Sequence, residues 1–251
     1  MSLAVIVFVC LPAAAHAALG VSLDATLTPE RLGHSTAVGL GFQIRERGGR
    51  VPPPLTEVDL QYPSELGIAT SGLGVATCVP ATLESLGVEG CPADSVMGYG
   101  TALTELPGAP ARLRETNGLT IVRGPTEGGH LTFLINATGA APVITALTFP
   151  AVLLPARAPY GERLLARIPP TPSFPGAPDV AVVKMHATLG SPGLLYNERV
   201  GNKVLTYHPA GILLPSRCPR GGFQFAARLG FQDGSHAVAR TTVECPRAKA
   251  S

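Results

Sequence analysis

The sequence predicts an all-β protein, an antiparallel β-sandwich of the Ig-like or jelly-roll-like kind with one short helix. Three observations support this fold class. Apolar and polar residues alternate with a period of two along most of the chain, as they do in strands with one buried face. The 29 Gly and 25 Pro residues gather between these runs, where turns are expected. Patterns typical of helices are nearly absent.

The N-terminus has the pattern of a secretory signal peptide over residues 1–17. An apolar run from Leu3 to Leu11 leads to Ala15-His16-Ala17, a small-x-small cleavage site. The run is shorter than the roughly 20 residues that span a bilayer. The basic residue that usually precedes such a run is missing, so a buried N-terminal strand or helix is the alternative. We expect cleavage near Ala17, a secreted or extracytoplasmic location, and one β-sandwich domain over residues 18–251.

Three strands are expected in the first part of that domain. Alternating apolar residues mark residues 21–27, 38–44 and 58–62, and each run places its apolar side chains on one face. One short helix follows at Pro80 to Leu86. Proline is favoured in the first turn of a helix and Gly87 would end it.

The middle of the chain predicts further strands. Residues 131–135 alternate, and residues 180–186 begin with apolar residues on both faces, which is typical of a central strand. The apolar stretch from Ala140 to Leu154 contains Pro142 and Pro150 and many Thr and Val residues. We interpret it as consecutive buried strands and not as a membrane span.

The last unit is a predicted β-hairpin. Alternating apolar residues from Phe223 to Phe231 lead into the turn at residues 232–235, and His236 to Glu244 returns as a second strand. The Asp-Gly pair in the turn tolerates the positive φ that tight hairpins require.

Proline- and glycine-rich connections at residues 48–54, 107–110 and 169–178 are interpreted as loops. The last is expected to be a surface connection. A polyproline ligand and a subdivision of the domain near residues 169–178 are the alternatives.

Four cysteines remain after cleavage: Cys78, Cys91, Cys218 and Cys245. Three connectivities are possible. We expect local disulfides, Cys78 with Cys91 around the short helix and Cys218 with Cys245 around the terminal hairpin. Each would contribute about 3 kcal/mol by loop closure. A zinc site is the rival interpretation, but neither pair has the short spacing of zinc ligands, and export favours oxidation.

Two segments around these cysteines resemble secreted actinobacterial β-proteins of uncharacterised function. The motifs are Pro52-Pro53-Pro54-Leu55, Val58-Asp59-Leu60, Cys91-Pro92-Ala93-Asp94-Ser95, Cys218-Pro219 and Cys245-Pro246. The resemblance implies export and an all-β fold. It brings no activity, substrate or catalytic residue to this chain.

Composition disfavours several functions. The net charge is +2 and the basic residues are scattered, so we expect no nucleic-acid partner. The acidic residues are dispersed, Trp is absent and aromatic residues make up 5% of the chain, which disfavours a glycosidase or a carbohydrate-binding module. No cofactor, metal ligand or catalytic residue is assigned.

Two arrangements contain residue types that are used in catalysis or metal binding. Ser235 and His236 lie beside Asp233, but neighbours in a tight turn point in different directions. The five histidines outside the leader are spread singly: His34, His130, His186, His208 and His236. We expect His130 and His186 to lie on strands, and they are the first pair to inspect for a site.

The sequence therefore predicts an exported, non-enzymatic cell-envelope or extracellular protein with a binding or structural role. Its partner would be an unknown protein or envelope component, and no membrane span is expected after the leader. A secreted hydrolase whose residues meet only in the fold is one alternative. A carrier of apolar ligands is the other, and it requires a sizeable apolar cavity.

Overall fold

The computed structural model describes residues 19–46, 48–63, 65–68, 71–106, 113–140, 144–171, 179–190 and 192–246. The predicted signal peptide lies outside these residues. So does most of the possible subdivision near residues 169–178, because residues 172–178 are not among those described.

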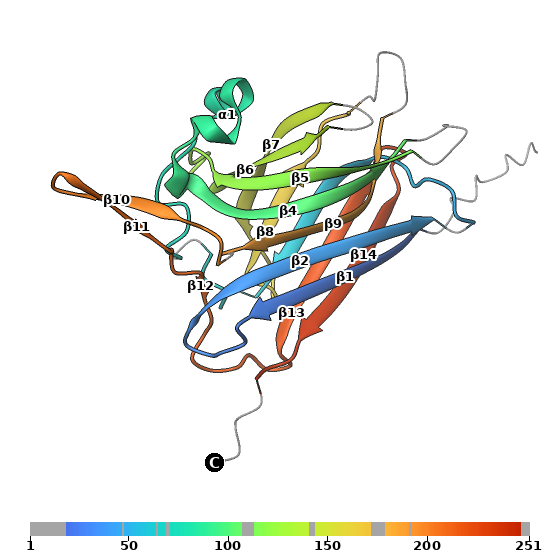
Figure 1. Cartoon of the computed structure of the whole chain (residues 1–251). Coiled ribbons are helices and arrows are strands. Elements are labelled where there is room, and N and C mark those ends of the chain that lie inside the picture. Colours follow the sequence, from blue (N-terminus) through green and yellow to red (C-terminus); the bar gives the residue numbers. More distant parts are fainter. Residues whose placement is uncertain are drawn as a thin grey trace, which may run out of the picture.

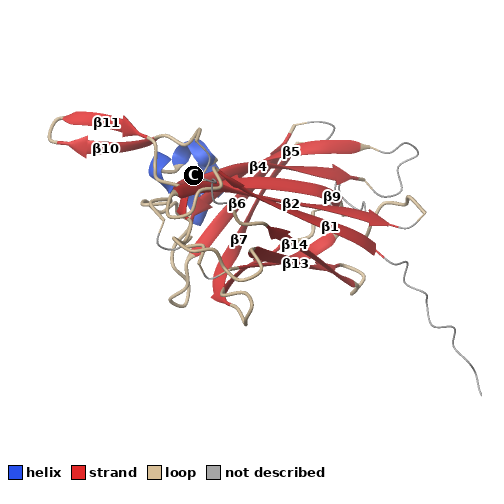
Figure 2. Cartoon of the chain, turned by 90° about the horizontal axis from the view of Figure 1, so that it is seen from below, coloured by secondary structure: helices blue, strands red, loops and turns tan. Residues whose placement is uncertain are grey.

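Most of the described chain forms one large antiparallel sheet (Figure 1). Along its main path the strands follow the order β1 (Leu19–Thr28), β2 (Ser35–Glu46), β9 (Ala181–Leu189), β4 (Val96–Glu105), β5 (Arg114–Arg123), β6 (Thr132–Gly139), β7 (Thr145–Pro155), β8 (Glu162–Arg167), β3 (Leu55–Tyr62), β13 (Phe223–Phe231) and β14 (His236–Val243). The two-residue strand β12 (Ile212–Leu213) pairs with β2. Strands β10 (Tyr196–Val200) and β11 (Lys203–Tyr207) form a separate hairpin that projects from the molecule (Figure 2).

The sheet curves until its two edge strands meet. Strand β14 lies beside β1 (Figure 1), but no backbone ladder joins them within the part of the chain that is described. Because the direction alternates at every pairing along the path, β1 and β14 run the same way. The result is a nearly closed sheet that surrounds an apolar interior.

One end of the sheet is covered by the segment between β3 and β4. This segment contains α1 (Pro80–Leu86) and two short 3-10 helices, η1 (Val88–Gly90) and η2 (Ala93–Ser95). Its backbone is tied to the sheet, because Cys78 N–H donates to Arg123 O of β5 at 2.8 Å, and to the β10–β11 hairpin, because Gly74 N–H donates to the Tyr196 hydroxyl at 2.8 Å. The segment therefore forms a fixed plug over this end.

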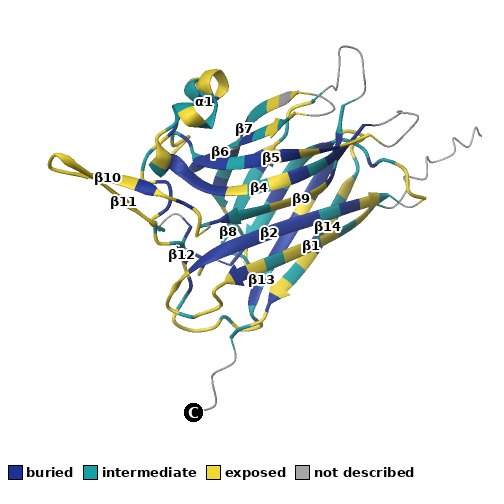
Figure 3. Ribbon diagram, viewed as in Figure 1, coloured by how far each residue is buried: buried dark blue, intermediate teal, exposed yellow. Residues whose placement is uncertain are grey.

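The apolar core divides into two parts. The larger part lies under the plug and includes the fully buried side chains of Leu66, Leu83 and Met97. The smaller part, around Phe42, Leu229 and Phe231, lies between β2, β3 and β13 toward the opposite end. Figure 3 shows the buried path of β2 between more exposed strands.

The predicted strands at residues 21–27, 38–44, 58–62, 131–135 and 180–186 are confirmed within a few residues at their ends. The helix at Pro80–Leu86 and the terminal hairpin are confirmed too, and Gly87 adopts the positive φ that ends the helix. Strands β4, β5, β8 and the β10–β11 hairpin were not predicted.

The prediction for residues 140–154 was wrong in one respect. Thr145–Pro155 is a single strand that continues through Pro150. Proline is tolerated there because β8 pairs with β7 only from Ala151 onward, so Pro150 lies at the end of that ladder. Residues 141–143 lie outside the described part of the chain.

Candidate functional site: an apolar cavity inside the sheet

The nearly closed sheet contains a cavity of about 190 Å³. Its walls are formed by inward-facing side chains of β2 to β9 and of β13, among them Leu40, Phe133, Leu147 and Leu164. Since successive side chains in a strand point to opposite faces, the period-two apolar pattern of the sequence supplies this lining directly. The wall is therefore apolar over most of its extent.

The plug forms the closed end of the cavity. Tyr62, Leu66 and Ile68 line the cavity there, and each is almost fully buried. The Tyr62 hydroxyl donates a hydrogen bond to Glu162 Oε2 at 2.8 Å. Burial, followed by the nearby Glu162 carboxylate, raises the pKa of Tyr62 above its ordinary value. The phenol therefore stays neutral at physiological pH.

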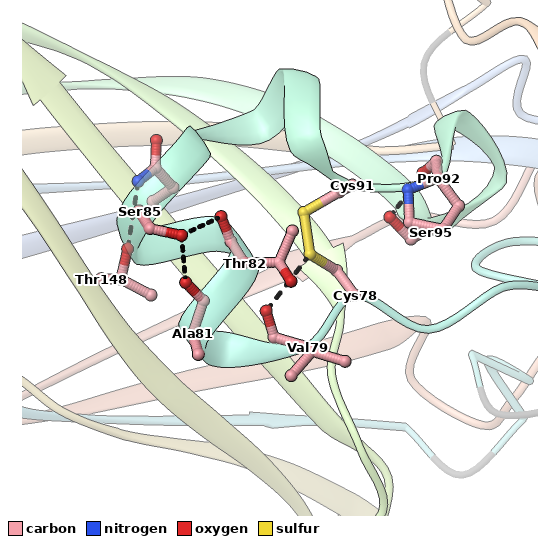
Figure 4. The surroundings of a disulfide bond; sticks show 10 residues. Cys78, Val79, Ala81, Thr82, Ser85, Cys91, Pro92, Ser95 and Thr148 are labelled. Carbon is pink, nitrogen blue, oxygen red and sulfur yellow. Dashed lines mark hydrogen bonds between the residues drawn. A yellow bond between two sulfur atoms is a disulfide. The ribbon is translucent and has the colours of Figure 1, made fainter.

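A cysteine pair outside the cavity joins the two ends of the α1 region of the plug (Figure 4). Cys78 and Cys91 lie at disulfide distance on either side of α1, with a Cα–Cα separation of 5.1 Å. Cys218 and Cys245 form the second pair, at 6.0 Å between Cα atoms, and join the two ends of the β13–β14 hairpin. The predicted local pairing is thus confirmed at the level of distance.

We call the opposite end of the cavity its mouth, because the lining residues Pro169, Pro170 and Gln232 are exposed there. Pro54, Pro169, Pro170 and Asp179 line it there, next to strand ends of β3, β8 and β9. Gln232 Nε2 donates to Asp179 Oδ2 at 2.7 Å across this rim. Polar side chains are thus concentrated around the mouth, whereas the deeper wall is apolar.

A buried polar group lies just inside the mouth. It consists of Thr104 near the end of β4 and of Glu115 and Asn117 near the start of β5, and all three line the cavity. Glu115 is 3% exposed and Asn117 is 4% exposed. Asn117 Nδ2 donates to Thr104 Oγ1 at 3.1 Å, and Thr104 Oγ1 donates to Glu115 O at 3.3 Å. These bonds hold the Asn117 amide in one orientation.

Two oxygens of this group have no hydrogen-bond partner among the described residues: Glu115 Oε1 and Asn117 Oδ1. Buried polar atoms are nearly always hydrogen-bonded in folded proteins, and an unsatisfied one carries a desolvation cost of about 1–3 kcal/mol. Two adjacent unsatisfied acceptors that face a cavity are therefore the strongest indication of a ligand contact in the described structure.

The histidines that the sequence singled out do not form such a site. His186 lies on the outer face of β9, and its Nδ1 is 3.9 Å from Asp24 Oδ2, with side chains 48% and 68% exposed. His130 lies in the turn before β6 and not in a strand, which corrects the prediction for this residue. The remaining three, His34, His208 and His236, are exposed.

The Asp233, Ser235 and His236 group forms a turn. Ser235 N–H donates to Asp233 Oδ1 at 2.9 Å, as in an Asx-turn, and His236 begins β14. The aspartate therefore stabilises the hairpin connection, in agreement with the interpretation made from the sequence.

Within the described ranges, no group of three or more His, Cys, Asp and Glu residues could hold a metal ion. No helix in the described part of the chain has the length and apolar character needed to cross a membrane. Comparisons with models of protein families, with curated proteins and with solved structures find no match to this chain. The resemblance to secreted actinobacterial β-proteins stays a prediction.

The sequence contained a signal for the polar group that was not recognised. Glu115 and Asn117 alternate with exposed residues in phase with Leu119 and Ile121, and this places all four on the inner face of β5. The run was not identified as a strand because its first inward residues are polar. An acid and an amide in phase with buried aliphatic residues would have indicated a polar site in the interior.

Proposed function

We propose that this protein is an exported, non-enzymatic binding protein that carries an apolar ligand inside its sheet. The observation that supports the proposal is the cavity of about 190 Å³ with its largely apolar wall. A cavity of about 150 Å³ lined by aliphatic and aromatic residues stays dry and binds benzene. A small or slender apolar molecule is therefore the occupant that the cavity best accommodates.

The incomplete burial of several side chains in the cavity wall agrees with this proposal. Ile135, Leu147 and Leu164 face the interior, yet they are only partly buried. Such side chains lack packing partners on their cavity side, so that a ligand would supply dispersion contacts that the empty protein lacks. In this proposal two parts of the curved sheet face each other across the cavity, which is the sandwich arrangement that the sequence predicts.

Export is the second part of the proposal. Two cysteine pairs at disulfide distance support it, because structural disulfides persist mainly in oxidising compartments. The leader at residues 1–17 remains an expectation from the sequence. A hydrolase finds no support in the described histidines, because none of them meets an acid within a concave site.

A binding experiment with a blocked cavity tests the proposal. The full chain is expressed in an exporting host, purified, and titrated with toluene and with octanol by calorimetry. In one variant, Ala137→Phe, a ring is added to the cavity wall. In its control, Thr138→Phe, the same ring is added to the exposed outer face of the same strand.

We expect the unmodified protein and Thr138→Phe to bind both probes, and Ala137→Phe to bind them at least tenfold more weakly. Bound probe should also raise the melting temperature of the first two proteins, since a ligand that binds only the folded state stabilises it. Absence of binding in the unmodified protein would contradict the proposal, as would equal binding to Ala137→Phe.

A further inference from the structure

The ligand's polar end can be inferred from the group inside the mouth, and this inference rests on the proposed function. Glu115 and Asn117 lie at the mouth end of β5, whereas Leu119 and Ile135 line the wall beyond them. A ligand that follows the cavity would therefore have a polar atom near the mouth and an apolar tail toward the plug.

The atoms that face the ligand are acceptors. Asn117 directs its amide nitrogen to Thr104, so its free atom is the carbonyl oxygen Oδ1. Glu115 contributes the carboxylate oxygen Oε1. Two acceptors without partners call for a group that donates at least two hydrogen bonds.

The Glu115 carboxylate also indicates which charge the ligand carries. An ionised carboxylate away from water requires a cationic or hydrogen-bonding partner. The neighbouring Arg114 pairs instead with Glu105. Arg114 and Glu115 are successive residues of β5, so their side chains point to opposite faces of the sheet. No ion pair of Glu115 is found among the residues that the structure describes.

Gly139 provides the space for this polar group. A Cβ at Gly139 would overlap Glu115 Oε1 and Asn117 Oδ1. Gly139 ends β6 beside the mouth-end half of β5, so the absence of a side chain there lets both oxygens occupy the inner surface. The glycine thus leaves the two acceptors together at one point of the wall.

We infer that the ligand is a primary alkylammonium compound, whose head donates to Glu115 Oε1 and Asn117 Oδ1 while its slender tail fills the apolar cavity. An ammonium group carries three donors and a positive charge, and charge-assisted hydrogen bonds are about twice as strong as neutral ones. The carboxylate head of a fatty acid would face the Glu115 carboxylate and two hydrogen-bond acceptors, so we expect fatty acids to bind poorly.

The test compares three probes with the same tail: octylamine, octanol and octanoate. Each is titrated by calorimetry into the unmodified protein, Glu115→Gln and the control Glu127→Gln, which removes an exposed carboxylate from a turn outside the cavity. Gly139→Ala forms a fourth protein, in which a methyl group is added beside the two acceptors.

We expect the unmodified protein and Glu127→Gln to bind octylamine at least tenfold more tightly than octanol, with octanoate weakest. Glu115→Gln should lose this preference and keep its octanol affinity within about threefold. Gly139→Ala should weaken octylamine more than octanol.

The probe series in the unmodified protein is decisive even if a variant fails to fold. Equal binding of octylamine and octanol, or tightest binding of octanoate, would overturn this inference and leave the carrier proposal standing. Retention of the octylamine preference in folded Glu115→Gln would also overturn it. If no probe binds, octanol included, the carrier proposal itself fails.

Discussion

The Tyr62 hydroxyl allows a prediction in which the sign of a mutational effect depends on pH. Tyr62 is 2% exposed, lies where the plug meets the cavity, and donates a hydrogen bond to Glu162. Tyr62→Phe removes the hydroxyl and leaves the ring in place. A hydrogen bond to a charged group contributes about 1.5–3 kcal/mol. Because Glu162 is only partly buried and water can replace the phenol, we expect a loss of about 1 kcal/mol near pH 8.

Well above pH 10 the Tyr62→Phe substitution should have the opposite effect on stability. Burial and Glu162 raise the pKa of Tyr62 in the folded state, whereas in the unfolded chain its pKa is about 10. Stability from the neutral phenol is therefore complete below pH 10 and is lost as pH rises above it. At pH 11 the unfolded state gains RT ln(1 + 10), about 1.4 kcal/mol, from ionisation of this one residue. The Tyr62→Phe variant has no phenol at this position and does not lose stability in this way.

The two stability curves should therefore cross near pH 10.6, where the alkaline loss reaches about 1 kcal/mol. Urea unfolding followed by circular dichroism between pH 8 and 11.5 measures both curves. Tyr99→Phe, at a residue that is 45% exposed, is the control and should follow the unmodified protein. If Tyr62→Phe loses stability above pH 10 as steeply as the unmodified protein, with no approach of the curves, the assignment of a protected phenol is refuted.

Other predictions concern the cross-links and the plug. Replacing both Cys218 and Cys245, which are 27 residues apart, with Ser should lower the free energy of unfolding by about 3.6 kcal/mol through loop closure. Replacing both Cys78 and Cys91 with Ser should cost about 4 kcal/mol or more. Loop closure over a separation of 13 residues gives about 3 kcal/mol, and a Ser hydroxyl at the fully buried position of Cys78 adds about 1–3 kcal/mol because it needs a partner. Urea unfolding in which loss of the Cys218–Cys245 pair is the more destabilising change would contradict this. Leu83→Ala, which removes the buried side chain of α1, should cost about 2–5 kcal/mol and speed amide exchange in residues 80–86, and unchanged exchange would show that Leu83 does not anchor the helix.

Elements with strict alternation of apolar residues could be predicted from the sequence. The runs in β1, β2, β3 and the terminal hairpin identify both the strand and its inner face. A proline at the first position and a glycine just after the last position identify α1. These patterns are local, since each depends on side chains within a few residues of one another.

The elements that were missed depend on distant partners. β10 and β11 expose almost every residue, so no buried face marks them in the sequence. β4 contains Gly98 and Gly100, where the backbones of β4 and β9 come so close that a Cβ would meet the carbonyl oxygens of Thr188 and His186. Such glycines weaken the strand pattern for a reason that only the neighbouring strand reveals.

The candidate site could not be predicted from local patterns either, because it too depends on distant parts of the chain. Glu115 and Asn117 acquire their significance from a cavity whose walls come from strands far away along the chain, such as β2 and β13. The apolar carrier was an alternative that the composition of the chain left open, and an apolar cavity was the feature required for it. The strand order that encloses the cavity was not predictable from period-two patterns alone.

The line where β14 meets β1 has a consequence for how the wall moves. Every other junction along the described path is held by a backbone ladder, whereas no ladder joins β14 to β1 among the described residues. Amide protons that point across it should exchange with solvent ahead of those in β4 or β6. Widening or narrowing of the sheet at this line would therefore break no ladder hydrogen bond, and it is here that the cavity would change its width for ligands of different thickness.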